Sequence, residues 1–231
     1  MSDHEIRVGL SVSVSGRFQL QGQPALNGIL LWQSHANAKG GISLNGGMLR
    51  FVHLIWYDDG SRGSRARENV LRLIRNDNVD ILLGPYSSGL TMAAAEIAEE
   101  HKKILWNYGG TSDEIFSHGR RCLVGIASPA SDYLRELPRR LAEEFSEPSR
   151  ICVLYSGSGS FGWQVARGIL RSAFNVARHT VHLVPLNAPW QNHDTILGIL
   201  SGIGAEIVVP RCALLRPLPL AFVIFPLNSR K

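Results

Sequence analysis

Two short polar turns carry the residues best suited to bind a ligand. Ser87, Ser88 and Gly89 lie between an apolar run typical of a strand and a run with helical spacing. Free backbone N–H groups and the positive end of the helix dipole make such a helix start attractive to an anion, and serine hydroxyls add donors. Taken alone, the two serines are more often an ordinary helix cap. The second turn, Gly-Gly-Thr-Ser-Asp at residues 109–113, follows the next apolar run.

The two turns gain weight together because they end neighbouring predicted strands. In an open parallel sheet, the carboxyl ends of adjacent strands line the ligand crevice. Ser88, Gly109 and Thr111 are therefore predicted to converge on one small polar molecule, and a binding site becomes the favoured interpretation. Trp106, in the strand before the second turn, is a candidate wall for that ligand.

A third glycine-rich segment indicates a different chemistry. Residues 157–162 spell GxGxxG between a predicted strand and a predicted helix, which is the context of a dinucleotide pyrophosphate site. That site also needs an acidic residue about 20 positions further on, where this sequence has Val-Pro-Leu-Asn at residues 184–187. Tyr155 and Ser156 also continue the strand where a tight glycine turn should begin. An NAD(P)-dependent oxidoreductase is therefore the remote alternative.

The sequence contains no GxSxG, HExxH or P-loop pattern for catalysis or phosphate binding. His179 and His182 are three apart on a predicted strand and should face opposite sides of the sheet, which disfavours a shared metal ion. Asp58 and Asp59 end a strand, where a helix-capping turn is a commoner role than a pair of general bases. We therefore expect no catalytic residue, no metal, no cofactor and no enzymatic activity.

Apolar runs and amphipathic runs alternate from the start of the chain, which favours a parallel, doubly wound α/β sheet. Pro24 suits the first turn of a helix that Gly40 and Gly41 should end, and the pair Asn45–Gly46 predicts a turn. Strands are expected at residues 6–12, 49–56, 79–84, 104–107 and 123–127, and further helices at 64–76 and after Ser88.

Ser128 and Pro129 interrupt this alternation, so a domain boundary is expected at about residues 127–130. A second α/β run follows, with a helix over 132–145 that Pro138 should kink or restart. Further strands are expected at 151–155, 180–184 and 206–209, and helices at 162–175 and 194–203. The tail begins at about residue 210; residues 211–231 have three prolines and no helical period, which is compatible with an extended edge segment. We thus expect a ligand-binding lobe over 1–127 and a partial second lobe over 128–231.

Composition sets the remaining limits. The chain has 231 residues, of which 45% are hydrophobic and 19% charged, which excludes an intrinsically disordered protein. No apolar run reaches the ~20 residues that cross a bilayer, so the protein is not expected to be membrane-embedded. The net charge is +5, but no nucleic-acid partner is expected, because the clustered arginines have helical spacing and no interleaved aromatic residues. They indicate a solvated helix face: Arg62, Arg65, Arg67, Arg72 and Arg75.

With these residues in order, the chain resembles the branched-chain-amino-acid-binding (Leu/Ile/Val-type) periplasmic binding proteins, a family with the two-lobed type I fold. The resemblance runs from residue 6 to about 209 and is more specific as an ordered series than any single motif. The matching segments are Ile6–Leu10, Ser15–Gly16, Gly22, Asn37–Ile42, Tyr57–Asp59, Val79–Ser88, Gly110–Ser112, Val153–Tyr155 and Phe161–Gly162.

The resemblance implies a protein that closes on an amino acid or a similar small polar ligand without chemistry. It implies that Ser88, beside Ser87, binds the ligand carboxylate. Gly109 and Thr111 would supply a backbone group and a hydroxyl to the carboxylate and the ammonium group. Gln21 stands where a first-lobe aromatic residue is common, and Phe161 where a second-lobe aromatic residue is common. Because residue 21 is a glutamine, amino acids, amides, urea and aromatic acids all stay open as ligands.

The resemblance also implies a function and a compartment. Members are receptor components of ABC-type uptake systems, so the expected partners are a small-molecule ligand and an ABC permease, in the periplasm or outside the cell. The chain begins close to its first strand with no export signal, so a cytoplasmic amide- or amino-acid-sensing regulator of the same fold is the alternative. Because family members are longer, the second lobe is expected to be incomplete, by truncation or by a frameshift near residue 210.

Overall fold

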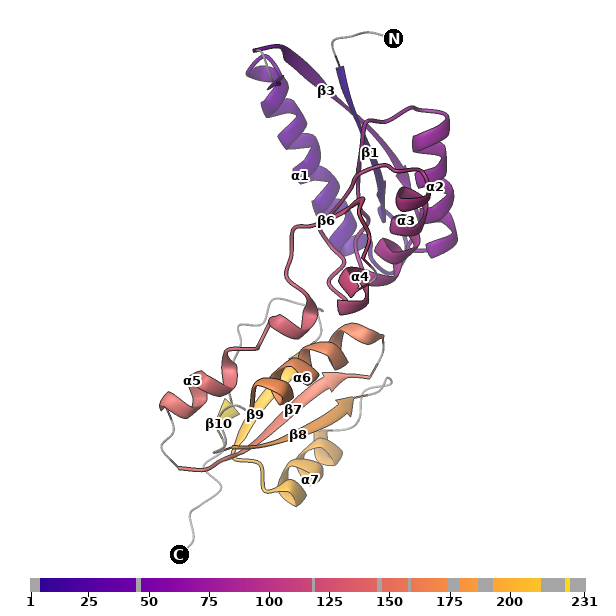
Figure 1. The fold of residues 1–231 in the computed structure, drawn as a ribbon. Helices are drawn as coiled ribbons and strands as arrows, with labels where there is room; N and C mark the ends of the chain where they lie inside the picture. The colour runs from indigo at the N-terminus through magenta and orange to yellow at the C-terminus, as the bar shows by residue number, and fades with distance from the viewer. Residues whose placement is uncertain are drawn as a thin grey trace, which may run out of the picture. The chain divides into compact units, whose positions relative to one another are not determined.

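The computed structural model describes residues 5–44, 47–117, 119–144, 147–157, 159–173, 179–186, 193–212 and 223–224 (Figure 1). The chain divides into two compact units, Met1–Ala127 and Ser128–Lys231, which are called unit 1 and unit 2 below. Each unit has its own sheet and its own hydrophobic core, and each is described by itself.

Unit 1 contains a six-stranded sheet with the strand order β2-β3-β1-β4-β5-β6. Strand β1 pairs in parallel with β3 and β4, and β5 pairs in parallel with β4 and β6, so their carboxyl ends share one edge. Only the two-residue β2 is antiparallel to its neighbour β3. The strands are β1 (Glu5–Val12), β2 (Ile42–Ser43), β3 (Leu49–Asp58), β4 (Ile81–Leu83), β5 (Leu105–Asn107) and β6 (Leu123–Gly125).

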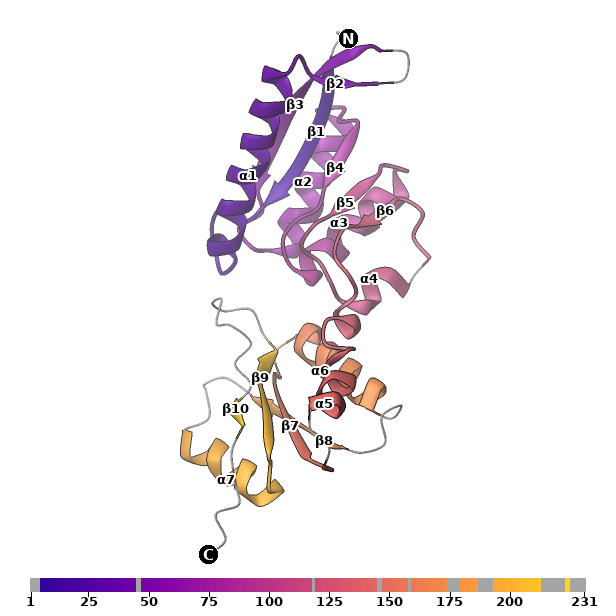
Figure 2. The same cartoon turned by 90° about the vertical axis from the view of Figure 1, so that its left-hand side faces the viewer.

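Helices cover both faces of this sheet, with α1 on one side and α2 and α3 on the other (Figure 2). The predicted inward residues of α2 (Ala66, Val70, Leu73 and Ile74) are all buried. The arginines of α2 lie on its exposed face, as the spacing predicted; Arg67 pairs with Glu96 and Arg72 lies over the Tyr57 ring. The helices are α1 (Gln19–Ala38), α2 (Gly63–Arg75), α3 (Ser88–Glu100) and α4 (Asp113–Ser117).

The first helix begins earlier than predicted. Helix α1 starts at Gln19, so the expectation that Pro24 opens it was wrong. The preceding loop already forms the first turn, because Gln19 N–H donates to Gly16 O at 3.1 Å and Gly22 N–H donates to Phe18 O at 2.8 Å. Pro24 is exposed inside the helix, on a side where water can replace the hydrogen bond that proline cannot donate.

Two short elements of unit 1 were not predicted from the sequence. Strand β2 pairs Ile42 with Arg50 and Ser43 with Leu49, and the predicted turn Asn45–Gly46 between them lies outside the described residues. Helix α4 occupies part of the polar segment after β5. Two-residue and five-residue elements are too short to show a hydrophobic period, so tertiary contacts decide them.

Unit 2 contains a four-stranded sheet with the order β10-β9-β7-β8, in which β7 is central and parallel to β8 and β9 (Figure 1). The strands are β7 (Arg150–Ser156), β8 (Thr180–Leu186), β9 (Ile207–Cys212) and β10 (Val223–Ile224). The helical elements are the 3-10 turn η1 (Ala130–Asp132), α5 (Leu137–Glu144), α6 (Ser160–Ala173) and α7 (His193–Ile203). The parallel α/β pattern predicted for both halves is confirmed.

Pro138 divides the helix that was predicted over residues 132–145. The structure has η1 first and then α5, with Pro138 as the second residue of α5, where its missing N–H is not needed. In the tail, Val223 and Ile224 form β10 antiparallel to β9, which agrees with an edge segment. The other tail residues, 213–222 and 225–231, lie outside the described residues.

Candidate functional site

The first polar turn caps α3 at the carboxyl end of β4. Ser87 is the N-cap residue, and its Oγ accepts a hydrogen bond from Leu90 N–H at 3.4 Å. Its backbone has a φ of 81° and a ψ of 147°, a conformation that residues other than glycine rarely adopt. Such a conformation costs about 1–3 kcal/mol and is found most often at functional sites.

Ser88 joins the two predicted turns directly. Its Oγ accepts a hydrogen bond from Thr111 N–H at 3.2 Å and another from Ser112 N–H at 3.0 Å. Thr111 and Ser112 are buried, whereas Ser88 is partly exposed. The structure therefore brings the segments that follow β4 and β5 together at Ser88, which was predicted to bind the ligand.

Backbone N–H groups add to the donors at this position. Ser88 and Gly89 are the first two residues of α3, and N–H groups at these positions have no acceptor within the helix. Gly89 is exposed, and a Cβ added there would meet no atom within 4 Å, so the helix start is open to solvent. The open N–H groups and the Ser88 hydroxyl form a cluster of donors suited to an anion.

Asn107 and Thr91 were not predicted as site residues, although both are fully buried beside the turns. Asn107 is the last residue of β5, and its side chain bonds to Gly109 and Gly110. The signal in the sequence was an asparagine two residues before a Gly-Gly pair, which is typical of a side chain that closes a turn.

A second set of loops at the same edge is held by two carboxylates. Asp59 is buried and accepts from Ser13 Oγ at 2.5 Å, Ser11 Oγ at 3.2 Å and Ser61 N–H at 2.8 Å. Asp58 accepts from Ser15 Oγ at 2.6 Å and from two backbone N–H groups. The N-cap of α2 is Arg62 with no side-chain cap bond, so the predicted helix-capping role was wrong; the carboxylates tie the β1 loop to the β3 loop.

The pKa values of these two carboxyl groups are shifted in opposite directions. Burial raises the pKa of Asp59 above its ordinary value, although the hydrogen bonds from Ser13, Ser61 and Ser11 oppose this. Burial also acts to raise the pKa of Asp58, but hydrogen bonds from Ser15, Gly60 and Val14 outweigh it and lower the pKa.

Replacing Asp59 with asparagine should change how stability depends on pH. Because the folded protein binds the Asp59 proton more tightly than the unfolded chain, this group's stabilisation is complete below its ordinary pKa and is lost as pH rises through its raised pKa. The unfolding free energy of Asp59→Asn, minus that of the natural protein, should therefore increase between pH 3 and pH 7. Denaturant unfolding of both proteins across this range tests the expectation, and parallel pH curves would contradict it.

Gln21 lies in the first turn of α1, and its Oε1 is buried without a hydrogen-bond partner among the described residues. The same is true of Tyr108 Oη, which follows β5. Burial and the nearby negative charge of Asp59 raise the pKa of Tyr108, so its hydroxyl stays protonated. Phe18 and Tyr86 also meet here, edge to face with ring centroids 5.6 Å apart, and so connect the β1–α1 loop with the β4–α3 turn.

Trp106 lies on the sheet face rather than in either turn. It is paired with Leu83 of β4 and Val124 of β6, and Leu83 packs into the cluster under α1. The Trp106 side chain is 41% exposed. Its role as a ligand wall stays a prediction.

In unit 2, Phe161 is the second residue of α6 and packs edge to face on Tyr133, with ring centroids 5.6 Å apart. Its ligand role stays a prediction from the resemblance. The GxGxxG segment leads into α6, with Gly159 at a φ of 76°, while Ser158 lies outside the described residues. The residue after β8, where a ribose-binding acid would stand, is also outside them and is an asparagine.

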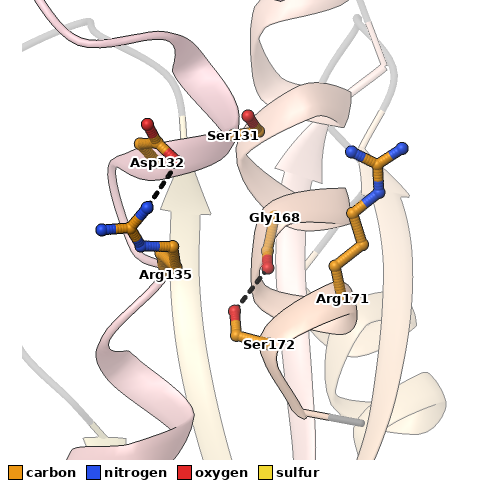
Figure 3. A pocket seen from close by; sticks show the side chains of 6 residues that line it. All are labelled: Ser131, Asp132, Arg135, Gly168, Arg171 and Ser172. Atoms are coloured by element: carbon orange, nitrogen blue, oxygen red, sulfur yellow. Dashed lines mark hydrogen bonds and ion pairs between the residues drawn. The ribbon is translucent and has the colours of Figure 1, made fainter. Parts of the chain in front are cut away.

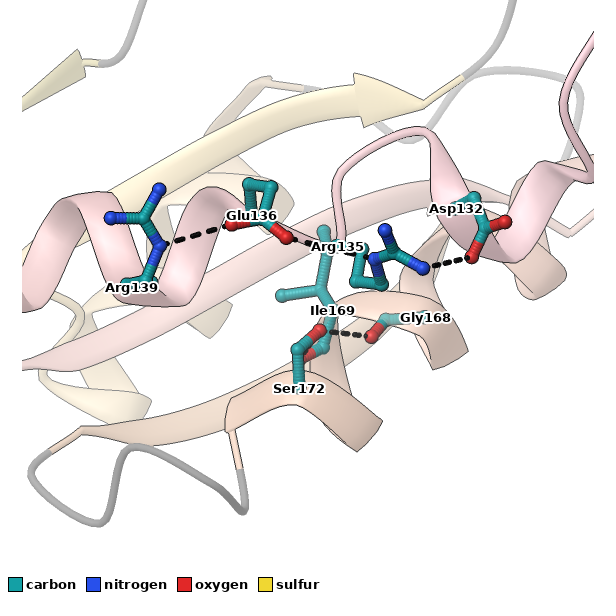
Figure 4. Close-up of polar contacts among 7 residues, drawn as sticks. All are labelled: Asp132, Arg135, Glu136, Arg139, Gly168, Ile169 and Ser172. Carbon is teal, nitrogen blue, oxygen red and sulfur yellow. Dashed lines mark hydrogen bonds and ion pairs between the residues drawn. The ribbon is translucent and has the colours of Figure 1, made fainter.

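A hollow of about 210 Å³ lies between η1 and α6 in unit 2 (Figure 3). In its lining, Arg135 pairs with Asp132 at 3.4 Å, and Ser172 Oγ donates to Gly168 O at 2.6 Å. Arg135 also pairs with Glu136, which in turn pairs with Arg139 (Figure 4). The hollow contains none of the predicted ligand residues, and its lining carries two arginines, Arg135 and Arg171, with one carboxylate, Asp132.

Within the described part of the chain, no group of three or more His, Cys, Asp or Glu residues is arranged to hold a metal ion. His179 accepts a hydrogen bond from Ser149 N–H at 3.2 Å through Nδ1, which is a structural role. No helix among the described residues is both long and apolar enough to cross a bilayer.

Comparison with known proteins identifies the relatives of this chain. Residues 5–189 match the family model described as periplasmic binding protein. A Leu/Ile/Val-binding protein homologue of Brucella suis is 28% identical over 170 residues, which is 71% of this chain and 41% of that protein.

Two solved structures illustrate the similarity in fold. The first is the branched-chain amino acid substrate-binding protein LivJ of Streptococcus pneumoniae, in complex with isoleucine. It matches with a TM-score of 0.70 at 20% identity, and the match covers 86% of this chain and 54% of LivJ. The second is a solute-binding protein of an ABC transporter from Rhodopseudomonas palustris, in complex with benzoate. It matches with a TM-score of 0.68 at 20% identity, and the match covers 88% of this chain and 54% of that protein.

The chain thus spans about half the length, or less, of the relatives it matches. The family match covers most of the chain and includes both polar turns as well as the GxGxxG segment. The α/β architecture with its parallel strands is consistent with the family that the model identifies. The chain belongs to the periplasmic binding protein family, and it has the type I fold of its structural neighbours.

Proposed function

We propose that this chain binds a small carboxylic acid at the carboxyl edge of the unit 1 sheet, as part of the solute receptor of an ABC-type uptake system outside the cytoplasm. The observation that carries the proposal is the donor cluster at Ser88. The hydroxyl of the partly exposed Ser88 stands there beside the open N–H groups that begin α3. A carboxylate is an anion with several acceptor sites, which is the complement of such a cluster.

The ligands named for the neighbouring structures support this class of molecule. They are isoleucine, benzoate, 4-hydroxybenzoate and 3,4-dihydroxybenzoic acid, and all four carry a carboxyl group. Their side groups are aliphatic in one case and aromatic in the others. The shared carboxylate therefore guides the proposal, and the side group is left to the test. In this proposal, residues 1–127 form the ligand-binding lobe and residues 128–231 form part of a second lobe.

Calorimetry with matched pairs of acids and amides tests the proposal. Isoleucine is compared with isoleucinamide, and benzoate and 4-hydroxybenzoate with their amides, so that only the carboxylate changes within a pair. At least one acid should bind, and its amide should bind at least about tenfold more weakly, because an amide offers fewer acceptor sites and no charge. Absence of heat and of any thermal shift with every acid, or equal binding of acid and amide, would overturn it.

Replacing Ser88 with alanine should weaken the binding of such an acid by about 1.5–3 kcal/mol, the value of a hydrogen bond to a charged group. Ser34→Ala is the matched control, because Ser34 is an exposed residue within α1 and away from the polar turns. Calorimetry of both variants with the acid that binds the natural protein gives the comparison. Equal affinities for all three proteins would show that the carboxylate binds elsewhere.

A further inference from the structure

We infer that Asn107 and Thr91 are positioning residues that hold the two turns so that the Ser88 hydroxyl acts toward the ligand only as a hydrogen-bond donor. The inference rests on the proposed function, because it concerns the same site. It assigns a role to two buried residues that do not themselves face the open start of α3.

Asn107 closes the turn that follows β5. Its side chain is fully buried, and Oδ1 accepts from Gly110 N–H at 2.7 Å and from Gly109 N–H at 3.2 Å. Its Nδ2 donates to Gly110 O at 2.6 Å. One amide side chain therefore satisfies both the N–H and the C=O of Gly110, which fixes the direction in which the chain leaves the turn toward Thr111.

Thr91 links that turn to the other one. It lies in the first turns of α3 and is fully buried, and its Oγ1 donates to Pro85 O at 3.1 Å, with Asn107 Oδ1 at 3.4 Å as a second acceptor. The contact is close: a Cβ added at Gly110 would lie 2.5 Å from Thr91 Oγ1, and one at Gly109 would lie 2.9 Å from Tyr86 Cα. The two turns are therefore packed against each other through Thr91 and Asn107.

The position of these turns determines which hydrogen bonds the Ser88 hydroxyl can make. With the turn held in place, Thr111 N–H and Ser112 N–H both donate to Ser88 Oγ. A hydroxyl oxygen has two acceptor positions and one proton. Both acceptor positions are occupied from within the protein, so only the proton is left for a ligand. The position next to Ser88 then favours an acceptor such as a carboxylate oxygen and disfavours an ammonium group.

Three substitutions test this inference. Asn107→Asp keeps the acceptor for the two glycine N–H groups but places a second oxygen against Gly110 O. Thr91→Val removes the hydroxyl and keeps the shape, whereas Thr91→Ser keeps the hydroxyl and removes a buried methyl group. If Thr91 serves only for packing, serine should be the more harmful change; if it positions the turns, valine should be.

Two measurements are made on each variant and on the natural protein. The first is hydrogen exchange at the Thr111 and Ser112 amides without ligand, with the β1 amides as the reference for the rest of unit 1. The second is affinity for isoleucine and benzoate by calorimetry. Asn107→Asp and Thr91→Val should each speed exchange at Thr111 and Ser112. Each should also weaken acid binding by about tenfold, the size of one lost hydrogen bond. Thr91→Ser should keep the exchange rates and the affinity of the natural protein.

Exchange and affinity in Asn107→Asp and Thr91→Val that equal those of the natural protein would overturn the inference. So would faster exchange at Thr111 and Ser112 with affinity unchanged, or a Thr91→Ser variant that binds more weakly than Thr91→Val. Failure of the proposed function looks different: the natural protein itself would bind neither acid, while the exchange measurement would still report whether Asn107 and Thr91 hold the turn.

Discussion

Replacing Gly22 with alanine is expected to destabilise unit 1 by about 2–3 kcal/mol, the cost of forcing an extra methyl group into close-packed structure. A Cβ at this position would lie 2.0 Å from the backbone oxygen of Ser13, and a backbone atom cannot rotate away as a side chain can. Helix α1 would have to move off the β1 loop. Hydrogen exchange at the β1 amides, which depends on unfolding of unit 1, measures the effect.

Gly28→Ala is the matched control for Gly22→Ala. Gly28 lies in the same helix and is exposed, and a Cβ there would meet no atom within 4 Å. Alanine should stabilise the helix at this position by about 0.5–1 kcal/mol, because glycine loses more backbone entropy on folding. The two substitutions should therefore have opposite signs. Equal effects would show that α1 does not depend on close approach at Gly22.

This close approach matters for the candidate site because the start of α1 carries Gln21, and Phe18 lies just before it. The Phe18 ring meets Tyr86 of the β4–α3 turn, so a shift of α1 would separate the two loops. We therefore expect Gly22→Ala to weaken acid binding as well as stability, whereas Gly28→Ala should leave acid binding unchanged.

Replacing Gly168 with alanine is expected to have a similarly large effect on unit 2. Gly168 lies within α6, and a Cβ there would be 2.0 Å from the backbone oxygen of Ser131 in η1. The expected loss is again about 2–3 kcal/mol, because α6 must separate from η1. Hydrogen exchange at the β7 amides, in the centre of the unit 2 sheet, measures it.

Gly198→Ala provides the comparison within unit 2. Gly198 lies in α7, is exposed, and has no atom within 4 Å of an added Cβ. A gain of about 0.5–1 kcal/mol is expected there for the reason given for Gly28. A stabilising effect of Gly168→Ala would show that η1 is not packed directly on α6.

Long elements with a clear period were predictable from the sequence, and short ones were not. The apolar positions of α2 recur at helical spacing, and they are the residues that the structure buries. Strand β2 has two residues and α4 has five, which is too short for a period to show. Pro24 was misleading because a proline is tolerated on the exposed side of a helix that has already begun before it.

The location of the candidate site was predictable from the sequence, whereas the buried contacts that hold its turns in place were not. Ser88 and Thr111 are recognisable because each follows an apolar run in a sequence that alternates strands and helices. Neither the sharing of the Ser88 oxygen by two N–H groups nor the buried contact between Thr91 and Asn107 has a local signature. These contacts join residues 16 to 24 positions apart, so only the folded sheet brings them together.

The most direct test of the proposed site is to locate the bound acid on the protein. Isotope-labelled protein is titrated with isoleucine and with benzoate, and backbone amide chemical shifts are followed by NMR. Saturable shifts are expected, and they should be largest at the amides of Ser88, Gly89 and Thr111. Saturable binding that leaves these three amides unmoved, or no saturable shift with either acid, would contradict it.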